Sequence, residues 1–378
     1  MQDETLSTAV VGALTAPSPL PHSALTPNHQ DEAPQPGLST VTSIDLSSIP
    51  RHVAEVLVKV YVDKILPQYP FFYAEQIASH FRAVYAGAMQ TQHPLPRVSK
   101  YIISMVMAVS TMTSKAVDFE KPMAFSDALF YGAMQHYETL KPNTLEALQA
   151  TMLICQFATF RPATADIWRA KDIAMRMAIG LGLHRHPIPK WHTLDAETVK
   201  LRANIFWVLY AMDRSFGIPT MRPLGIADEH IDAKFPEECL RDLQESQSIS
   251  EDVYARRRGT QWLNHVRLRQ LQSEVYGINF GTADIPFPSY QDWMSDMDRR
   301  LRLWKQNVDV EEFSETGPDW FDFVMSTIHF YLHNPCPRNP TPSEASLLIC
   351  FDAASTTLHG YVTQNFNIKP SLATVRRT

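Results

Sequence analysis

Apolar residues recur at helical spacing along most of this chain. In one stretch they fall at positions i, i+3, i+7, i+10, i+11 and i+14, which places them on a single face of a helix. The members of this stripe are Ile167, Ala170, Ala174, Met177, Ala178 and Leu181. Gly182 follows directly and is predicted to end the helix.

The next helix is predicted to begin near Asp195, because Asp195 and Glu197 suit the positive end of a helix dipole. Its apolar stripe consists of Leu201, Ile205, Val208, Leu209 and Met212. Aromatic residues widen that stripe nearly all the way round, namely Phe206, Trp207 and Tyr210. A helix with so little polar surface belongs in the middle of a large core, and Arg214 with the turn between Pro219 and Pro223 marks its exit.

The same periodicity predicts helices along most of the remaining chain. One opens at Pro50 with a stripe of Val53, Val56, Leu57 and Val60. Others carry their stripes within residues 102–112, 125–133, 145–155, 293–304 and 321–332. Asn143, with Glu146 three residues later, is predicted to cap the helix that carries Leu148 and Cys155.

A proline-rich turn over residues 334–343 precedes a late helix. Thr341 is the predicted N-cap of that helix, with Pro342 at its first position and Glu344 at its third. The apolar stripe that we expect to face inward behind this cap is Leu347, Phe351, Ala354, Leu358 and Tyr361.

Composition favours an all-α fold. The chain has 378 residues, of which only 13 are Gly, and its turn signals are too far apart for a series of short strands. We expect a single large helical domain of ten or more helices over residues 46–378. Residues 1–45 differ in kind, because Pro is scattered among Ser, Thr and Ala with almost no aromatic residues, and they are predicted to form a disordered leader.

The stretch from Trp168 to Pro236 joins a helix, a turn, an apolar helix and an acidic loop in fixed order. It resembles the middle homology region of fungal-specific transcription factors, and the turn over residues 334–343 also resembles one that this family places before a late helix. The resemblance spans residues 50–362. The residues that carry it are expected to build core and turns rather than to contact DNA, and include Trp168, Leu181, Gly182, His184, Arg185, Phe206, Trp207, Tyr210, Asp213, Arg214, Arg222, Pro223, Asp228 and Asp232.

This resemblance implies a nuclear transcription regulator, with a share in the cytoplasm left open. In the family the helical domain modulates activity, contributes to inhibition, or binds a second copy or other regulators. The setting that it implies is control of a metabolic pathway or of a secondary-metabolite gene cluster. Some members accept a small-molecule effector in a core pocket, and the 19 Phe and 15 Met residues are compatible with such a pocket, although the favoured interpretation is that they pack the core.

The cysteines do not supply the zinc cluster that normally precedes this domain. A binuclear cluster needs six closely spaced thiolates, whereas this chain has only Cys155, Cys239, Cys336 and Cys350, the nearest two of which are 14 residues apart. We interpret them as buried or incidental thiols. An alternative is that the gene of a DNA-binding zinc cluster regulator has lost its first part in annotation.

Charge also argues against direct DNA binding by this chain alone. The formal net charge is −6, which is not the basic footprint that phosphate contacts require. The compact basic runs are 256–258 and 376–377. The favoured interpretation of the first is the solvated start of a helix, and a nuclear-localisation signal is the alternative.

No enzyme, metal or cofactor site is predicted. The chain lacks the aspartate-rich cluster of a terpene cyclase, and His184, Arg185 and His186 are better explained as a C-terminal helix cap than as metal ligands. Asp228 and Asp232 are expected to form ion pairs or to be solvated. No apolar run approaches the roughly 18 residues of a membrane span, and the acidic N-terminus does not resemble a secretory signal, so we expect a soluble intracellular protein. A small-molecule-binding or catalytic protein derived from the same fold is the remaining alternative.

Overall fold

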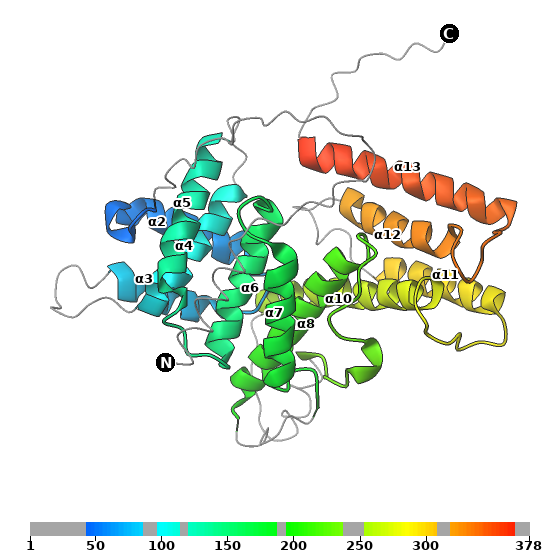
Figure 1. Ribbon diagram of the computed structural model, residues 1–378, viewed down its shortest axis with the longest axis horizontal. Coiled ribbons are helices and arrows are strands. Elements are labelled where there is room, and N and C mark those ends of the chain that lie inside the picture. Colours follow the sequence, from blue (N-terminus) through cyan, green and yellow to red (C-terminus); the bar gives the residue numbers. More distant parts are fainter. Residues whose placement is uncertain are drawn as a thin grey trace, which may run out of the picture. The chain divides into compact units, whose positions relative to one another are not determined.

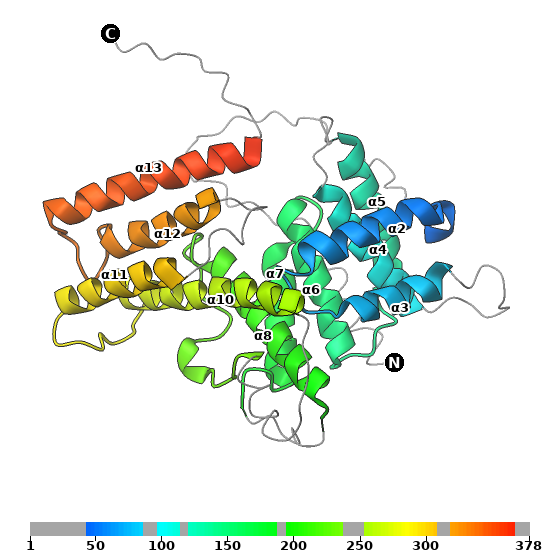
Figure 2. The same cartoon turned by 180° about the vertical axis from the view of Figure 1, so that it is seen from behind.

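The chain is all-α wherever its structure is described. The computed structural model describes residues 43–85, 97–113, 120–186, 194–236, 253–307 and 318–366, and within these ranges it has eleven α-helices and no strand. The predicted leader over residues 1–45 lies outside the described residues except for its last three. Figures 1 and 2 show the helices from two opposite sides.

The chain divides into two compact units. The first comprises residues 1–213 and 224–262, and the second comprises residues 214–223 and 263–378. Two helices contribute to both units, α8 (Ala196–Gly217) and α10 (Val253–Asn279). The single domain expected over residues 46–378 stays a prediction.

Helix α4 forms the centre of the first unit. It spans Arg97–Met112 and contacts α2 (Arg51–Val60), α3 (Ala74–Tyr85), α5 (Glu120–Tyr137) and α6 (Leu145–Phe160). All residues from 101 to 109 are buried, because helices cover α4 on several sides. Helix α7 (Ile167–Gly180) packs in turn against α6.

Helix α8 is as deeply buried as its sequence predicts. Asp195 caps its start, where the Thr198 backbone N–H donates to Asp195 Oδ1 at 2.7 Å. Every residue from Ala203 to Arg214 is buried, which confirms the prediction of an apolar helix inside a core. The helix continues three residues beyond Arg214 and ends at Gly217.

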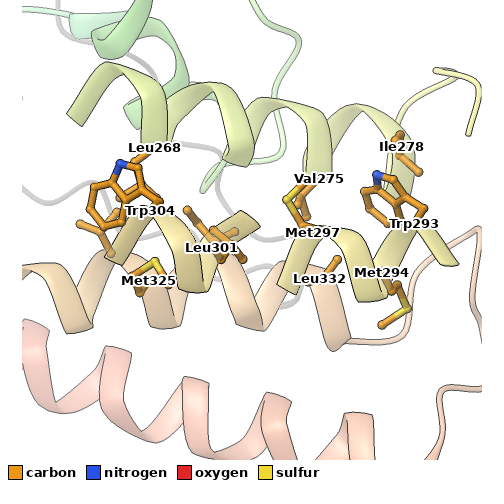
Figure 3. Close-up of a cluster of buried hydrophobic side chains, with 12 residues drawn as sticks. Leu268, Val275, Ile278, Trp293, Met294, Met297, Leu301, Trp304, Met325 and Leu332 are labelled. Carbon is orange, nitrogen blue, oxygen red and sulfur yellow. The ribbon is translucent and has the colours of Figure 1, made fainter. Parts of the chain in front are cut away.

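The core of the second unit lies between α10, α11 (Tyr290–Asn307) and α12 (Pro318–His333). Figure 3 shows side chains of the three helices meeting in one apolar layer. Trp293, Met297, Leu301 and Trp304 are buried as their spacing predicts, and so are Val324, Ile328 and Leu332. The predicted stripe member Phe321 lies outside the residues whose side chains are described.

The predicted inward face of the last helix is wrong. Helix α13 (Glu344–Phe366) packs against α12, but Leu347, Phe351 and Leu358 are 46%, 68% and 67% exposed. The residues that face inward are small, because Ser346 and Ala353 are the buried ones. The periodicity places the large apolar residues on one side of the helix. The opposite side, which carries the small residues, is the one that packs against α12.

A similar but smaller error affects α2. Of its predicted stripe, Val53 and Val56 are 37% and 62% exposed, whereas Ala54 is buried. The small side chain allows the backbone of α2 to approach its neighbours closely.

Two predicted helix caps also need correction. The N-cap of α6 is Thr144, whose Oγ1 accepts from the Ala147 backbone N–H at 3.2 Å, while Asn143 adopts a left-handed conformation with φ of 57°. The N-cap of α13 is Ser343 rather than Thr341, because the Ser346 backbone N–H donates to Ser343 Oγ at 3.2 Å. In both cases the hydroxyl nearest to the first helical turn is the cap.

Candidate functional site

The centre of the stretch from Trp168 to Pro236 is a buried ion pair between α7 and α8. Lys171 Nζ lies 2.6 Å from Asp213 Oδ1, and the two side chains are 1% and 0% exposed. A second carboxylate, Asp172 Oδ1, lies 2.7 Å from the same Nζ and is largely exposed. The Gly225 backbone N–H donates to both Asp213 oxygens, at 3.1 and 3.0 Å, so the pair also fixes the loop that follows the turn.

Electrostatics keep Lys171 charged in this site. Burial lowers the pKa of its ammonium, but the attraction of Asp213 and the hydrogen bonds to Asp172 and Asp213 outweigh that effect, so the pKa is raised above its usual value. The Trp168 ring adds a cation–π contact, with its centroid 5.1 Å from Lys171 Nζ. Removal of one partner of such a pair leaves an uncompensated buried charge, which makes both partners structurally necessary.

Sequence reasoning missed Lys171. The signal was available, because residues 167, 171, 174 and 178 fall on one helical face and Lys171 is the only charged residue among them. A lysine on an apolar face needs either a path to solvent or a buried acid, and Asp213 was already a motif residue.

Near its C-terminus, α7 is joined to the loop at residues 231–236. Gly182, with φ of +70°, ends the helix as predicted, and the Leu183 backbone N–H donates back to the Ala178 carbonyl at 3.0 Å. The His184 carbonyl accepts from the backbone N–H groups of Asp232 and Ala233, both at 3.1 Å. These bonds tie two segments that lie almost fifty residues apart in sequence.

The Asp232 side chain completes this connection. Its Oδ1 accepts from the His186 backbone N–H at 2.7 Å, and Arg185 Nη2 lies 3.2 Å from Oδ2. The expected ion pairing of Asp232 is therefore present, but Arg185 and His186 hold the loop rather than serving only as a helix cap. Burial and the charge of Arg185 lower the pKa of His184, which favours its neutral form.

The aromatic residues of α8 anchor the same loop from inside. Tyr210 donates its hydroxyl to Asp228 Oδ1 at 2.9 Å. Trp207 Nε1 donates to the Lys234 carbonyl at 3.0 Å, and its ring stacks on Phe235 with centroids 4.5 Å apart. Arg202 Nη2 donates to the Leu181 carbonyl at 2.7 Å and so holds the end of α7 against α8.

The remaining motif residues belong to the second unit. Arg214 is fully buried, and its Nε lies 3.4 Å from Ser273 Oγ on α10. Arg222 and Pro223 lie in the exposed turn, where the Arg222 backbone N–H donates to the Gly217 carbonyl at 3.0 Å. Arg214, Arg222 and Pro223 therefore lie in a different unit from Asp213. The first unit holds Asp213 together with Trp168, His184, Arg185, Phe206 and Asp228.

A Ser-His-Asp contact in the second unit has the residue types of a hydrolase but not the access. His333 Nε2 lies 3.3 Å from Asp298 Oδ1 on α11, and His333 Nδ1 lies 3.3 Å from Ser346 Oγ on α13. Both Ser346 and His333 are buried, so a substrate cannot reach the hydroxyl. The contact instead ties α13 and α11 to α12.

The cysteines in the described part of the chain form no disulfide. Cys155, Cys336 and Cys350 are free, and Cys239 lies outside the described residues. Burial raises the pKa of the Cys155 thiol to about 12 and also raises that of Cys350. In the same described ranges, no group of three or more His, Cys, Asp or Glu side chains is arranged to hold a metal ion. None of the helices described there is long and apolar enough to cross a membrane.

Similar proteins are regulators of transcription and of metabolic pathways. A positive regulator of purine utilization from Emericella nidulans is 25% identical over 74% of this chain and 34% of its own length. Pyrimidine pathway regulatory protein 1 of Saccharomyces cerevisiae is 26% identical over 57% of this chain and 25% of its own length. A negative regulator of pleiotropic drug resistance from Candida glabrata is 25% identical over 52% of this chain and 19% of its own length.

The chain thus spans about a third or less of the length of these curated relatives. No solved structure matches it. The fungal specific transcription factor domain matches residues 58–306, which is more than half of the chain and includes the α7–α8 ion pair. The chain therefore belongs to the family of proteins that carry the fungal specific transcription factor domain.

Proposed function

We propose that this protein regulates transcription in the nucleus as a helical regulatory domain that acts through partners. The observation that carries the proposal is the match of the fungal specific transcription factor domain over residues 58–306. Its partners are other transcription regulators or a second copy of the same chain. A non-catalytic role agrees with the site, where the charged motif residues Asp213 and Asp232 contact other parts of the fold.

The proposed targets are genes of a metabolic pathway. Two of the similar proteins are named for purine utilization and for the pyrimidine pathway, which supports metabolic control. Control of a secondary-metabolite cluster and a small-molecule effector both stay predictions.

Contact with DNA is proposed to come from a partner or from another part of a longer protein. The four cysteines of the chain are too few for a binuclear zinc cluster, and its net charge is −6. Six closely spaced cysteines encoded upstream in the genome would favour the second of these sources.

A deletion strain with transcript profiling tests the proposal. We expect one set of metabolic transcripts to change, and chromatin immunoprecipitation of the tagged protein to recover the promoters of that set. Rescue with wild type or with Glu55→Ala, an exposed control, should restore the transcripts, whereas Asp213→Ala should not. Unchanged transcripts together with one stalled metabolic step would contradict the proposal and favour a catalytic protein.

A further inference from the structure

A short segment ahead of α2 contacts three helices of the first unit, α3, α4 and α5. We call this segment, residues 43–49, the strap. It contains one turn of 3₁₀-helix (Leu46–Ser48), and its Leu46 and Ile49 side chains are 3% and 6% exposed. The other residues of the strap are exposed or half-buried. The strap therefore contacts the unit through a few side chains and through its own backbone.

Helix α5 holds the first part of the strap by its backbone. The Ile44 backbone N–H donates to the Ala128 carbonyl at 3.2 Å, and Gln135 Nε2 donates to Ser43 Oγ at 3.1 Å. Gly132 lies between these two contacts along α5. A Cβ added there would lie 2.6 Å from the Ile44 carbonyl oxygen, which is closer than a Cβ can approach a backbone atom. The strap can therefore lie on α5 only because residue 132 is a glycine.

The glycine at this place in α5 has a structural reason. Glycine inside a helix is less stable than alanine, because its backbone loses more conformational freedom on folding. Gly180, at the end of α7, provides the contrast, since a Cβ there would meet no atom within 4 Å. At Gly132 the backbone of the strap occupies the space of the missing side chain. The contact with the strap thus requires a residue that disfavours the helix on which the strap lies.

The remaining polar contacts of the strap are with α3 and α4. Tyr85 of α3 donates its hydroxyl to the Leu46 carbonyl at 3.3 Å, and Lys100 Nζ of α4 lies 3.8 Å from Asp45 Oδ2. The Asp45 side chain is 62% exposed, so this ion pair contributes little to docking. Within the described part of the chain, three hydrogen bonds join the strap to the helices.

The turn inside the strap is closed by hydrogen bonds of its own. The Ser47 backbone N–H donates to Asp45 Oδ1 at 2.8 Å, and the Ile49 backbone N–H donates to the Leu46 carbonyl at 3.1 Å. On α5 the Ala128 carbonyl lies inside a helix, where the backbone N–H four residues further on is its regular partner. Separation of the strap from α5 therefore leaves this carbonyl bonded, while the backbone N–H that the strap withdraws bonds to water.

We propose that the strap is a releasable clamp, which joins α3 to α5 when it is docked and separates from them while the helices stay folded. Docking orders the seven residues 43–49, which costs conformational entropy. The burial of two apolar side chains and the three hydrogen bonds to the helices oppose that cost. The opposing contributions are of similar size, so both states of the strap are populated.

Release of the strap changes where the N-terminal part of the chain is attached to the first unit. In the docked state residues 1–42 are joined to the unit beside Gln135 of α5. In the released state the attachment moves to Arg51, the first residue of α2. A molecule that binds one state more tightly than the other shifts this equilibrium. The strap can thus couple a binding event on the N-terminal segment to the helical unit, whatever the unit regulates.

Amide hydrogen exchange of the full chain tests the proposal, with the strap and residues 101–109 of α4 followed separately. In wild type the protection of the strap amides should be at least about tenfold lower than that of the α4 amides, because the strap opens without the unit. Gly132→Ala should speed exchange in the strap at least about tenfold and leave exchange in α4 unchanged. Gly180→Ala is the matched control, because it adds the same methyl group where no atom lies within 4 Å. It should leave exchange in the strap unchanged.

A second variant loosens the strap without a change on α5. Leu46→Ala with Ile49→Ala removes both buried side chains and should also speed exchange in the strap alone. Its control is Val53→Ala with Val56→Ala, two exposed residues of α2, which should change exchange in neither segment. If the strap and α4 were equally protected in wild type, or exchanged faster together in either strap variant, the strap would be a fixed part of the core and the proposal would be overturned. Unchanged exchange of the strap in either strap variant would overturn it as well.

Discussion

Helices α8 and α13 both carry a broad row of large apolar residues, yet the surroundings of these rows differ. In α8 every residue from Ala203 to Arg214 is buried. In α13 the large side chains Phe351 and Leu358 are about two-thirds exposed, and the small residues Ser346 and Ala353 face inward. A row of large apolar residues at helical spacing thus identifies a helix, but it does not say which side of the helix the core of the same chain covers.

The largest loss of stability should come from removing Asp213, the buried carboxylate of α8. Asp213→Ala leaves the Lys171 ammonium without its buried partner, and we expect a loss of about 3–5 kcal/mol in the free energy of unfolding. Urea unfolding at neutral pH measures it. The double variant Lys171→Met with Asp213→Leu should recover at least half of that loss, because neither partner of the pair is then left as an unpaired buried charge. A loss below about 1 kcal/mol for Asp213→Ala would show that exposed Asp172 alone compensates Lys171.

A matched pair of leucines compares the two helices directly. Leu209→Ala in α8 removes a fully buried side chain and should cost about 2–5 kcal/mol. Leu358→Ala in α13 should change the stability by no more than about 0.5 kcal/mol. Urea unfolding measures both variants. An equal loss in the two variants would mean that Leu358 of α13 is buried in the folded protein.

The end of α7 offers a test of backbone conformation alone. A Cβ added at Gly182 or at Gly180 would meet no atom within 4 Å, but only Gly182 has a positive φ, of +70°. Gly182→Ala should therefore cost about 1–2 kcal/mol, whereas Gly180→Ala should stabilise the helix by about 0.4–1 kcal/mol. Thermal unfolding of the two variants should shift in opposite directions. If the unfolding temperatures of both variants shifted in the same direction, the left-handed conformation of Gly182 would not be the cause of the change in stability.

The smallest expected effects concern the first turns of α6 and α13. Thr144→Ala and Ser343→Ala should each cost about 1 kcal/mol through the loss of a capping hydrogen bond. Thr341→Ala should change stability by less than about 0.5 kcal/mol, because the Thr341 hydroxyl does not cap the helix. Denaturation midpoints measure all three, and a larger loss from Thr341→Ala than from Ser343→Ala would restore the cap predicted from sequence.

Sequence periodicity correctly predicted the buried faces of helices that other helices surround. The stripes of α4, α8 and α11 were predicted correctly. Neighbouring helices cover these three helices, so that apolar residues such as Leu209 and Met297 are fully buried. Gly182 was predicted to end α7 because its conformation is a local property of the chain. Helix ends that depend on local conformation, and helices that are deeply buried, are therefore the features of this fold that the sequence predicts most directly.

What sequence reasoning missed depends on contacts between distant segments. The partner of Lys171 lies 42 residues further along the chain, and only the packing of α7 on α8 brings Asp213 to it. The inward face of α13 was predicted wrongly because large apolar residues such as Phe351 and Leu358 were expected to be buried within the chain, whereas both are exposed. The caps Thr144 and Ser343 were missed by one and two residues, since several hydroxyl or amide side chains lie close to each helix start.

The interleaving of the two units along the chain has a consequence for synthesis on the ribosome. Residues 214–223 belong to the second unit, but the first unit resumes at Leu224 and is completed only at Trp262. The Gly225 backbone N–H, which holds Asp213 of α8, and the loop around Asp232, which bonds to the end of α7, emerge only after both helices. The first unit can therefore complete its packing only after residues 214–223 of the second unit and the segment up to Trp262 have been synthesised.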